Sequence, residues 1–227
     1  MYQQIRSKYF NEHWDITVIL LLSSWFAITL EIIRLLISEH NNYFYFIWNL
    51  FLAWIPYLIS IYLPIAFYKL KPRIIAYFLL IVWFLFWPNS PYIVTDLLHL
   101  RQKQNIPLWF DLGLILSFAS TGLMLGYISL VEIQNLVRKR MNRTAGWAFA
   151  VFVLISGSFG IYAGRYQRLN SWDVFNPDKF LSAMLMHFSD QMKLTELTGM
   201  TILYFVWLLL GYLTVKIIIK IPDRMAL

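Results

Sequence analysis

Long apolar runs dominate this chain, and short polar stretches separate them. Six runs lie at residues 16–37, 43–68, 74–94, 109–136, 146–164 and 199–219. Each has roughly the 20 residues that a helix needs to cross a bilayer. A helix satisfies its own backbone inside lipid, whereas a barrel would show short alternating strands. The pattern predicts an all-α, polytopic membrane protein with six transmembrane helices in a single domain, residues 1–227.

Composition excludes the soluble classes. Hydrophobic residues make up 59% of the chain and charged residues 14%, against about 25% charged residues in an average soluble protein. A soluble fold of this length could not hide so much apolar surface from water. The chain has no cysteine, which excludes disulfides, thiolate catalysis and Cys-ligated metals.

The basic residues predict the orientation of the helices. If the N-terminus is cytoplasmic, the short loops on that side hold 12 of the 19 Lys and Arg residues: Arg6, Lys8, Lys69, Lys71, Arg73, Arg138, Lys139, Arg140, Arg143, Lys216, Lys220 and Arg224. The positive-inside rule then places both termini in the cytoplasm. The net charge of +7 is therefore interpreted as a topology signal, and no nucleic-acid partner is expected.

The long connection at 165–198 is expected on the extracytoplasmic side. Asn176-Pro177 is typical of a helix start. Apolar residues then recur at helical spacing: Phe180, Leu181, Met184, Leu185, Phe188 and Met192. They predict an amphipathic helix on the outer membrane surface or on the bundle.

The third run contains a break. From Ile74 to Trp87 it is purely apolar, about 21 Å of helix, and Pro88-Asn-Ser-Pro91 follows. Two prolines remove two backbone donors, so we expect the third helix to be broken at Pro88–Pro91. Unwound backbone at membrane depth must face protein or a water-filled cavity, as in binding sites built on broken helices. A plain helix end with an interfacial turn is the alternative.

The stretch after the break carries Thr95, Asp96 and His99. Helical spacing places Asp96 and Thr95 each beside His99. Three chemistries remain open: Asp96 and His99 bind a metal, Asp96 orients His99 as a general base, or His99 activates Thr95 or Ser90 as a nucleophile. The structural alternative is that these polar side chains cap backbone groups freed by the break.

Other polar residues are expected at the same depth. Glu31 and Arg34 lie one helical turn apart in the first span, where buried charges need partners. Asp111 opens the fourth span. Arg165 and Arg168 share a helix face and could grip an anionic group; alternatively, they pair with acidic residues to hold the bundle together.

Small residues at four-residue spacing predict close helix packing. They are Gly122 and Gly126 in the fourth span, and Ser156, Gly160 and Gly164 in the fifth.

Four stretches resemble a bacterial membrane family known as domain-of-unknown-function family 1361. They are Trp48-Asn-Leu-Phe-Leu-Ala-Trp-Ile-Pro56, Pro88-Asn-Ser-Pro-Tyr-Ile-Val-Thr-Asp-Leu-Leu-His-Leu100, Trp109-Phe-Asp111 and Gly164-Arg-Tyr-Gln-Arg-Leu-Asn-Ser-Trp-Asp173. The resemblance implies a multi-span protein of the bacterial cell membrane. It implies no activity.

These observations predict a polar pocket that is open to the extracytoplasmic side. Its candidate catalytic residues are Asp96, His99 and Thr95. Its candidate substrate-binding residues are Asn49, Asn89, Arg165, Arg168, Asn170 and Asp173. If a divalent metal is the cofactor, its candidate ligands are Asp96, His99 and Asp111.

Three classes of function fit this pocket. The first is a hydrolase or transferase acting on a membrane lipid or a lipid-linked anionic substrate. The second is a small-solute or ion transporter, favoured by the broken helix but not by the absence of an internal repeat. The third is a non-catalytic assembly partner, whose buried polar groups only specify the fold.

Overall fold

All elements in the described part of the chain are helices. The structure, a computed structural model, describes residues 2–37, 45–69, 73–100, 106–167, 178 and 191–225. The elements are α1 (Tyr2–Ile37), α2 (Tyr45–Lys69), α3 (Ile74–Phe86), α4 (Asn89–Tyr92), the 3₁₀-helix η1 (Ile93–His99), α5 (Leu108–Arg140), α6 (Arg143–Tyr166) and α8 (Gln191–Met225).

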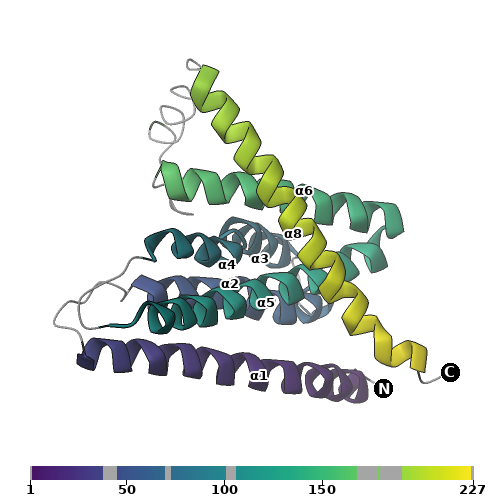
Figure 1. Cartoon of the computed structure of the whole chain (residues 1–227). Helices are drawn as coiled ribbons and strands as arrows, with labels where there is room; N and C mark the ends of the chain where they lie inside the picture. The colour runs from purple at the N-terminus through teal and green to yellow at the C-terminus, as the bar shows by residue number, and fades with distance from the viewer. Residues whose placement is uncertain are drawn as a thin grey trace.

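Six helical stretches are long and apolar enough to cross a membrane. They are His13–Ile37, Tyr45–Tyr68, Ile74–Leu98, Leu108–Arg140, Arg143–Tyr166 and Gln191–Ile219. The predicted all-α architecture with six spans is confirmed. The third span combines α3, α4 and η1. Because the number of spans is even, the two termini lie at the same end of the bundle (Figure 1). We call this the terminal end, and the end that holds η1 and the end of α6 the distal end.

Helix α5 lies at the centre of the bundle and contacts α1, α2, α4, η1, α6 and α8. Helix α1 packs mainly on α5, and α8 crosses the bundle obliquely and packs mainly on α6 (Figure 1). Both outer helices expose large apolar side chains, such as Trp25 and Leu36 on α1 and Leu203 on α8. In a bilayer these faces meet lipid, which explains the excess of apolar residues over what the core uses.

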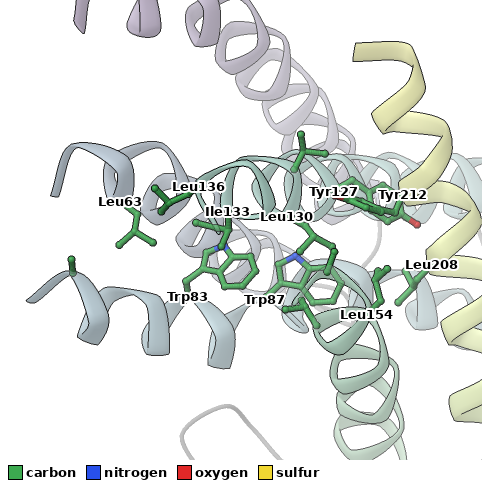
Figure 2. Close-up of a cluster of buried hydrophobic side chains, with 14 of the residues drawn as sticks. Leu63, Trp83, Trp87, Tyr127, Leu130, Ile133, Leu136, Leu154, Leu208 and Tyr212 are labelled. Carbon is green, nitrogen blue, oxygen red and sulfur yellow. The ribbon is translucent and has the colours of Figure 1, made fainter. Parts of the chain in front are cut away.

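The terminal half of the bundle encloses an apolar core (Figure 2). The indole nitrogen of Trp83 donates to Ser129 Oγ at 2.6 Å, and that of Trp87 donates to the Gly126 carbonyl at 2.9 Å. The Tyr212 hydroxyl donates to Gln134 Oε1 at 2.6 Å. These bonds allow large amphipathic rings to be buried at little polar cost.

The break in the third span is a tightening of the helix, and the expected unwinding is wrong. Helix α3 ends at Phe86, but Trp87, Pro88 and Ile93 all keep right-handed helical dihedrals. Proline removes a donor without disturbing φ. The Ser90 N–H therefore bonds the Trp87 carbonyl three residues back, at 3.1 Å. The Asn89 side chain donates to the Phe86 carbonyl at 2.9 Å.

Glycines on two neighbouring helices hold this kinked segment. A Cβ at Gly122 or Gly126 of α5 would come within 2.8 Å of Ser90. A Cβ at Gly157 of α6 would overlap the Trp87 ring, and one at Gly160 would touch Pro88 at 3.0 Å. Close packing at Gly122, Gly126 and Gly160 was predicted. The segment that packs on them is the one at Pro88–Ile93.

Candidate functional site

The distal end holds a buried ion pair between η1 and α6. Asp96 on η1 is 1% exposed, and its Oδ1 lies 3.3 Å from Arg165 Nη1 on α6. Its Oδ2 accepts a hydrogen bond from Asn49 Nδ2 on α2 at 3.2 Å. One carboxylate thus joins three elements. For Arg165, the structure thus shows the pairing with an acidic residue that was the alternative to anion binding.

The local sequence explains why Asp96 points inward. The kink at Pro88–Pro91 turns the chain against α5, and η1 continues from it with Ile93 fully buried. Positions three apart align in a 3₁₀-helix, so Ile93 and Asp96 share one face of η1. The same face that packs into the bundle therefore carries the carboxylate.

A second buried ion pair joins α1 to α5. Arg34 Nε donates to Asp111 Oδ1 at 2.8 Å, and Arg34 Nη2 donates to Oδ2 at 3.4 Å. Both residues are 1% exposed. Asp111 lies in the first turn of α5, where the helix dipole favours an acidic group. The expectation that Arg34 finds a polar partner in the bundle is confirmed. Glu31, one turn earlier on α1, is fully buried too.

Arg165 differs from Arg34 in its surroundings. Its side chain is 12% exposed, whereas that of Asp96 is 1% exposed. Within the described part of the chain, Asp96 is the hydrogen-bond acceptor of this guanidinium, through Nη1. Arginine carries five N–H donors. Among the described residues no second acceptor contacts this guanidinium, which leaves its remaining donors for a further acceptor.

Tyrosines of α6 and α8 lie near Arg165. Arg165 interacts electrostatically with Tyr204 of α8, which also interacts with Tyr166. The rings of Tyr162 and Tyr166 stack on α6 with centroids 5.0 Å apart. Sequence reasoning missed these tyrosines as site residues. The four-residue spacing of Tyr162 and Tyr166 around Arg165 was the available signal.

Two predicted site residues donate hydrogen bonds to backbone carbonyls beside the Pro88–Pro91 segment. Asn89 donates to the Phe86 carbonyl, and Thr95 Oγ1 donates to the Tyr92 carbonyl at 2.7 Å. These bonds agree with the local-capping alternative for short polar side chains near a break.

The metal site predicted at Asp96, His99 and Asp111 does not form a cluster of ligands among the described residues. Both oxygens of Asp111 contact the Arg34 guanidinium, so a metal at Asp111 would have to displace a cation. The described residues include no group of three or more His, Asp or Glu side chains with metal-binding geometry. His99 is the last residue of η1, but its side chain lies outside the described part.

Further predictions also fall outside the described residues. They are the substrate-binding roles of Arg168, Asn170 and Asp173, and the amphipathic helix of the long loop. These remain predictions.

A separate polar group lies nearer the terminal end, and sequence reasoning did not identify it. His13 Nε2 of α1 lies 3.2 Å from Glu132 Oε1 of α5. Thr17 Oγ1 lies 2.8 Å from the Tyr57 hydroxyl of α2. These contacts cross between helices, so no local spacing in the sequence announces them. Together with the Arg34–Asp111 pair they attach both halves of α1 to the bundle.

The distal geometry suits anion binding. Asp96, itself bonded to Asn49, holds the Arg165 guanidinium in place. The side chain therefore does not have to become ordered when its donors bind an anion. Tyrosine side chains near Arg165 can donate hydrogen bonds to an anion through their hydroxyl groups. The apolar core of the terminal half separates this site from the other end of the bundle.

Comparison with known proteins gives a family and no activity. Neither a curated protein nor a solved structure matches the chain. The family model described as "Protein of unknown function (DUF1361)" matches residues 48–220. The matched part includes Asn49, Asp96 and Arg165, whereas Arg34 on α1 precedes it. The chain therefore belongs to the DUF1361 family.

Proposed function

We propose that this protein binds a lipid or a lipid-linked anionic substrate at its distal end, as a membrane hydrolase or transferase. The observation that carries the proposal is the placement of Arg165. Asp96 holds it on one side, and among the described residues no second acceptor contacts its other donors, near exposed Tyr166 and partly exposed Tyr204. Arginine binds phosphate and carboxylate groups through paired N–H donors, so an anionic group is the ligand that this site fits best.

Position in the membrane favours a lipid-borne anion. Arg165 is at the end of a span, one residue before α6 ends at Tyr166. This is the depth at which a lipid presents its phosphate group. A membrane substrate therefore reaches Arg165 by lateral diffusion, while its apolar tail stays in the hydrocarbon layer.

The roles of Asp96 and His99 follow from this arrangement. Both oxygens of Asp96 are hydrogen-bonded, so we assign it to positioning Arg165. His99 follows Asp96 by three residues in η1, and such positions align in a 3₁₀-helix. His99 is our candidate general acid or base. Thr95 is the weaker candidate nucleophile because its hydroxyl donates to the Tyr92 carbonyl.

One alternative function also has a specific observation in its favour. Asp96 and Asp111 use all four carboxylate oxygens in bonds within the bundle. Satisfied polar networks can specify a fold without any chemistry, which favours a non-catalytic assembly partner. Transport is less well supported, because buried Trp83 and Trp87 fill the terminal half between α3, α5 and α6.

Turnover distinguishes the enzyme from the assembly partner. The wild-type chain would be placed in nanodiscs made from a bacterial total lipid extract, and the lipids followed by mass spectrometry. We expect the wild type to consume one anionic lipid class. We expect His99→Ala and Arg165→Gln to abolish consumption while remaining monodisperse. Unchanged lipids with the wild type would favour the assembly partner, and consumption by Arg165→Gln would exclude this site.

We further propose that the chain resides in the bacterial plasma membrane with both termini cytoplasmic. The basic loops at the terminal end support this orientation, and the family resemblance supports the bacterial membrane. It places Arg165 on the extracytoplasmic side.

Cysteine labelling tests the orientation. Because the chain has no cysteine, single cysteines can replace Ser7, Ser182 and Ala226 without background. In intact cells a membrane-impermeant thiol reagent should label position 182 and leave 7 and 226 unlabelled until the membrane is opened. Labelling of 7 and 226 with protection of 182 would reverse the orientation.

A further inference from the structure

The terminal end carries a surface of exposed cations on two neighbouring helical hairpins. Its members are Arg73, before α3, and Arg138, Lys139, Arg140 and Arg143, around the turn between α5 and α6. We call these five residues the basic surface. The two hairpins touch there, because the Arg140 guanidinium lies 4.1 Å from the centre of the Phe67 ring on α2. The cations therefore form one surface.

Acidic residues are scarce in the sequence on either side of this surface. The sequence has no Asp or Glu between residues 40 and 95, nor between 133 and 172. Arg143 is also the first residue of α6, a position where the helix dipole disfavours a cation. These two stretches of the chain therefore carry an excess of positive charge at this end of the bundle.

The length of α5 fixes the depth of the basic surface. Its 33 residues span roughly 50 Å at 1.5 Å per residue, more than the hydrocarbon core of about 30 Å. The last turn, which carries Arg138, Lys139 and Arg140, therefore reaches the headgroup layer. The centre of the Tyr68 ring lies 5.9 Å from Arg140 Cζ, and Tyr68 is 77% exposed. Such exposure is expected of an aromatic side chain at the membrane interface.

We propose that the basic surface binds the phosphate groups of anionic phospholipids in the leaflet at the terminal end. Basic clusters beside a span attract anionic headgroups, and the attraction falls off within a Debye length of the membrane. A nucleic acid or a soluble anion would need the surface to stand clear of the headgroups. This proposal does not depend on the site at Arg165, which lies at the opposite end.

Native mass spectrometry of the full chain in a neutral detergent tests the proposal. The probes are phosphatidylglycerol and phosphatidylcholine with identical acyl chains. We expect the wild type to prefer phosphatidylglycerol. The triple variant Arg138→Gln, Lys139→Gln and Arg143→Gln should lose that preference by roughly fivefold for each cation removed. Arg140 stays in place because it packs on Phe67.

Two controls keep the outcome interpretable. The double variant Arg138→Lys and Arg143→Lys retains the charge and should bind phosphatidylglycerol like the wild type. The melting temperature should not distinguish the three proteins, because the replaced side chains are exposed. Equal binding of the two lipids by the wild type, full binding by the triple variant, or displacement of the lipid by millimolar inorganic phosphate would each overturn the proposal.

Discussion

Replacing Arg34 with Gln should lower the free energy of unfolding by about 3–5 kcal/mol. Arg34 and Asp111 are each 1% exposed and share two hydrogen bonds. Removal of the guanidinium leaves a buried carboxylate without its counter-charge, which is more costly than the net value of the pair. Titration with a denaturing detergent, followed by circular dichroism, measures the loss. Asp111→Asn should give a loss of similar size.

The double variant Arg34→Gln, Asp111→Asn provides the internal control. Because the two side chains act on each other, its cost should be clearly smaller than the sum of the two single costs. Asp15→Asn removes an exposed charge from α1 and should change stability by less than about 0.5 kcal/mol. Additive costs for Arg34 and Asp111 would show that the pair is not coupled.

Gly157→Ala should destabilise the bundle by about 1–3 kcal/mol, the usual cost of overpacking. The new Cβ would overlap the Trp87 ring. Trp87 is 1% exposed, and its indole nitrogen is bonded to the Gly126 carbonyl, so the ring cannot move aside without losing a buried hydrogen bond. The melting temperature in detergent should fall.

Gly113→Ala is the matched control for this substitution. It lies on an exposed face of α5, and nothing lies within 4 Å of an added Cβ. Here the change should leave stability unchanged or raise it by up to about 1 kcal/mol, since alanine favours helix. Adding Trp87→Phe to Gly157→Ala should restore part of the loss. Equal effects at positions 113 and 157 would contradict the packing.

The sequence predicted the six spans because lipid imposes one solution on long apolar runs. The position of the break at Pro88–Pro91 was also predictable from the missing donors. Its form was not, because the rescue depends on local bonds from Ser90 and Asn89. Proline forbids a particular hydrogen bond, but the geometry that replaces it depends on the glycines of α5 and α6 that seat the segment.

The buried ion pairs were likewise only partly predictable from the sequence. Spacing identified Asp96 and Arg165 as polar groups at one depth, and their contact followed because the break brings η1 toward the bundle. The partner of Arg34 could not be deduced. Its sequence neighbour Glu31 was the obvious candidate, but the Arg34 guanidinium bonds Asp111, 77 residues away. Cross-helix partners depend on helix rotation, which periodicity alone does not determine.

Helix α1 lies outside the region that matches the family but contacts side chains within it. The family match starts at residue 48, yet Asp111 and Glu132 within it contact Arg34 and His13 of α1. The first helix thus brings a counter-charge to Asp111 and an imidazole contact to Glu132. The free energy of unfolding of the Arg34→Gln variant therefore also tests how strongly α1 is bound to the rest of the bundle.

Binding of a lipid-linked phosphate tests the central claim most directly. A polyprenyl phosphate and the matching uncharged polyprenol would be titrated into the full chain in neutral detergent. We predict that the wild type prefers the phosphate and that Arg165→Gln weakens phosphate binding by about tenfold or more, the value of a charge-assisted hydrogen bond. Lys193→Gln, at the same end of the bundle, should keep the preference. Equal phosphate binding by the wild type and Arg165→Gln would contradict the account.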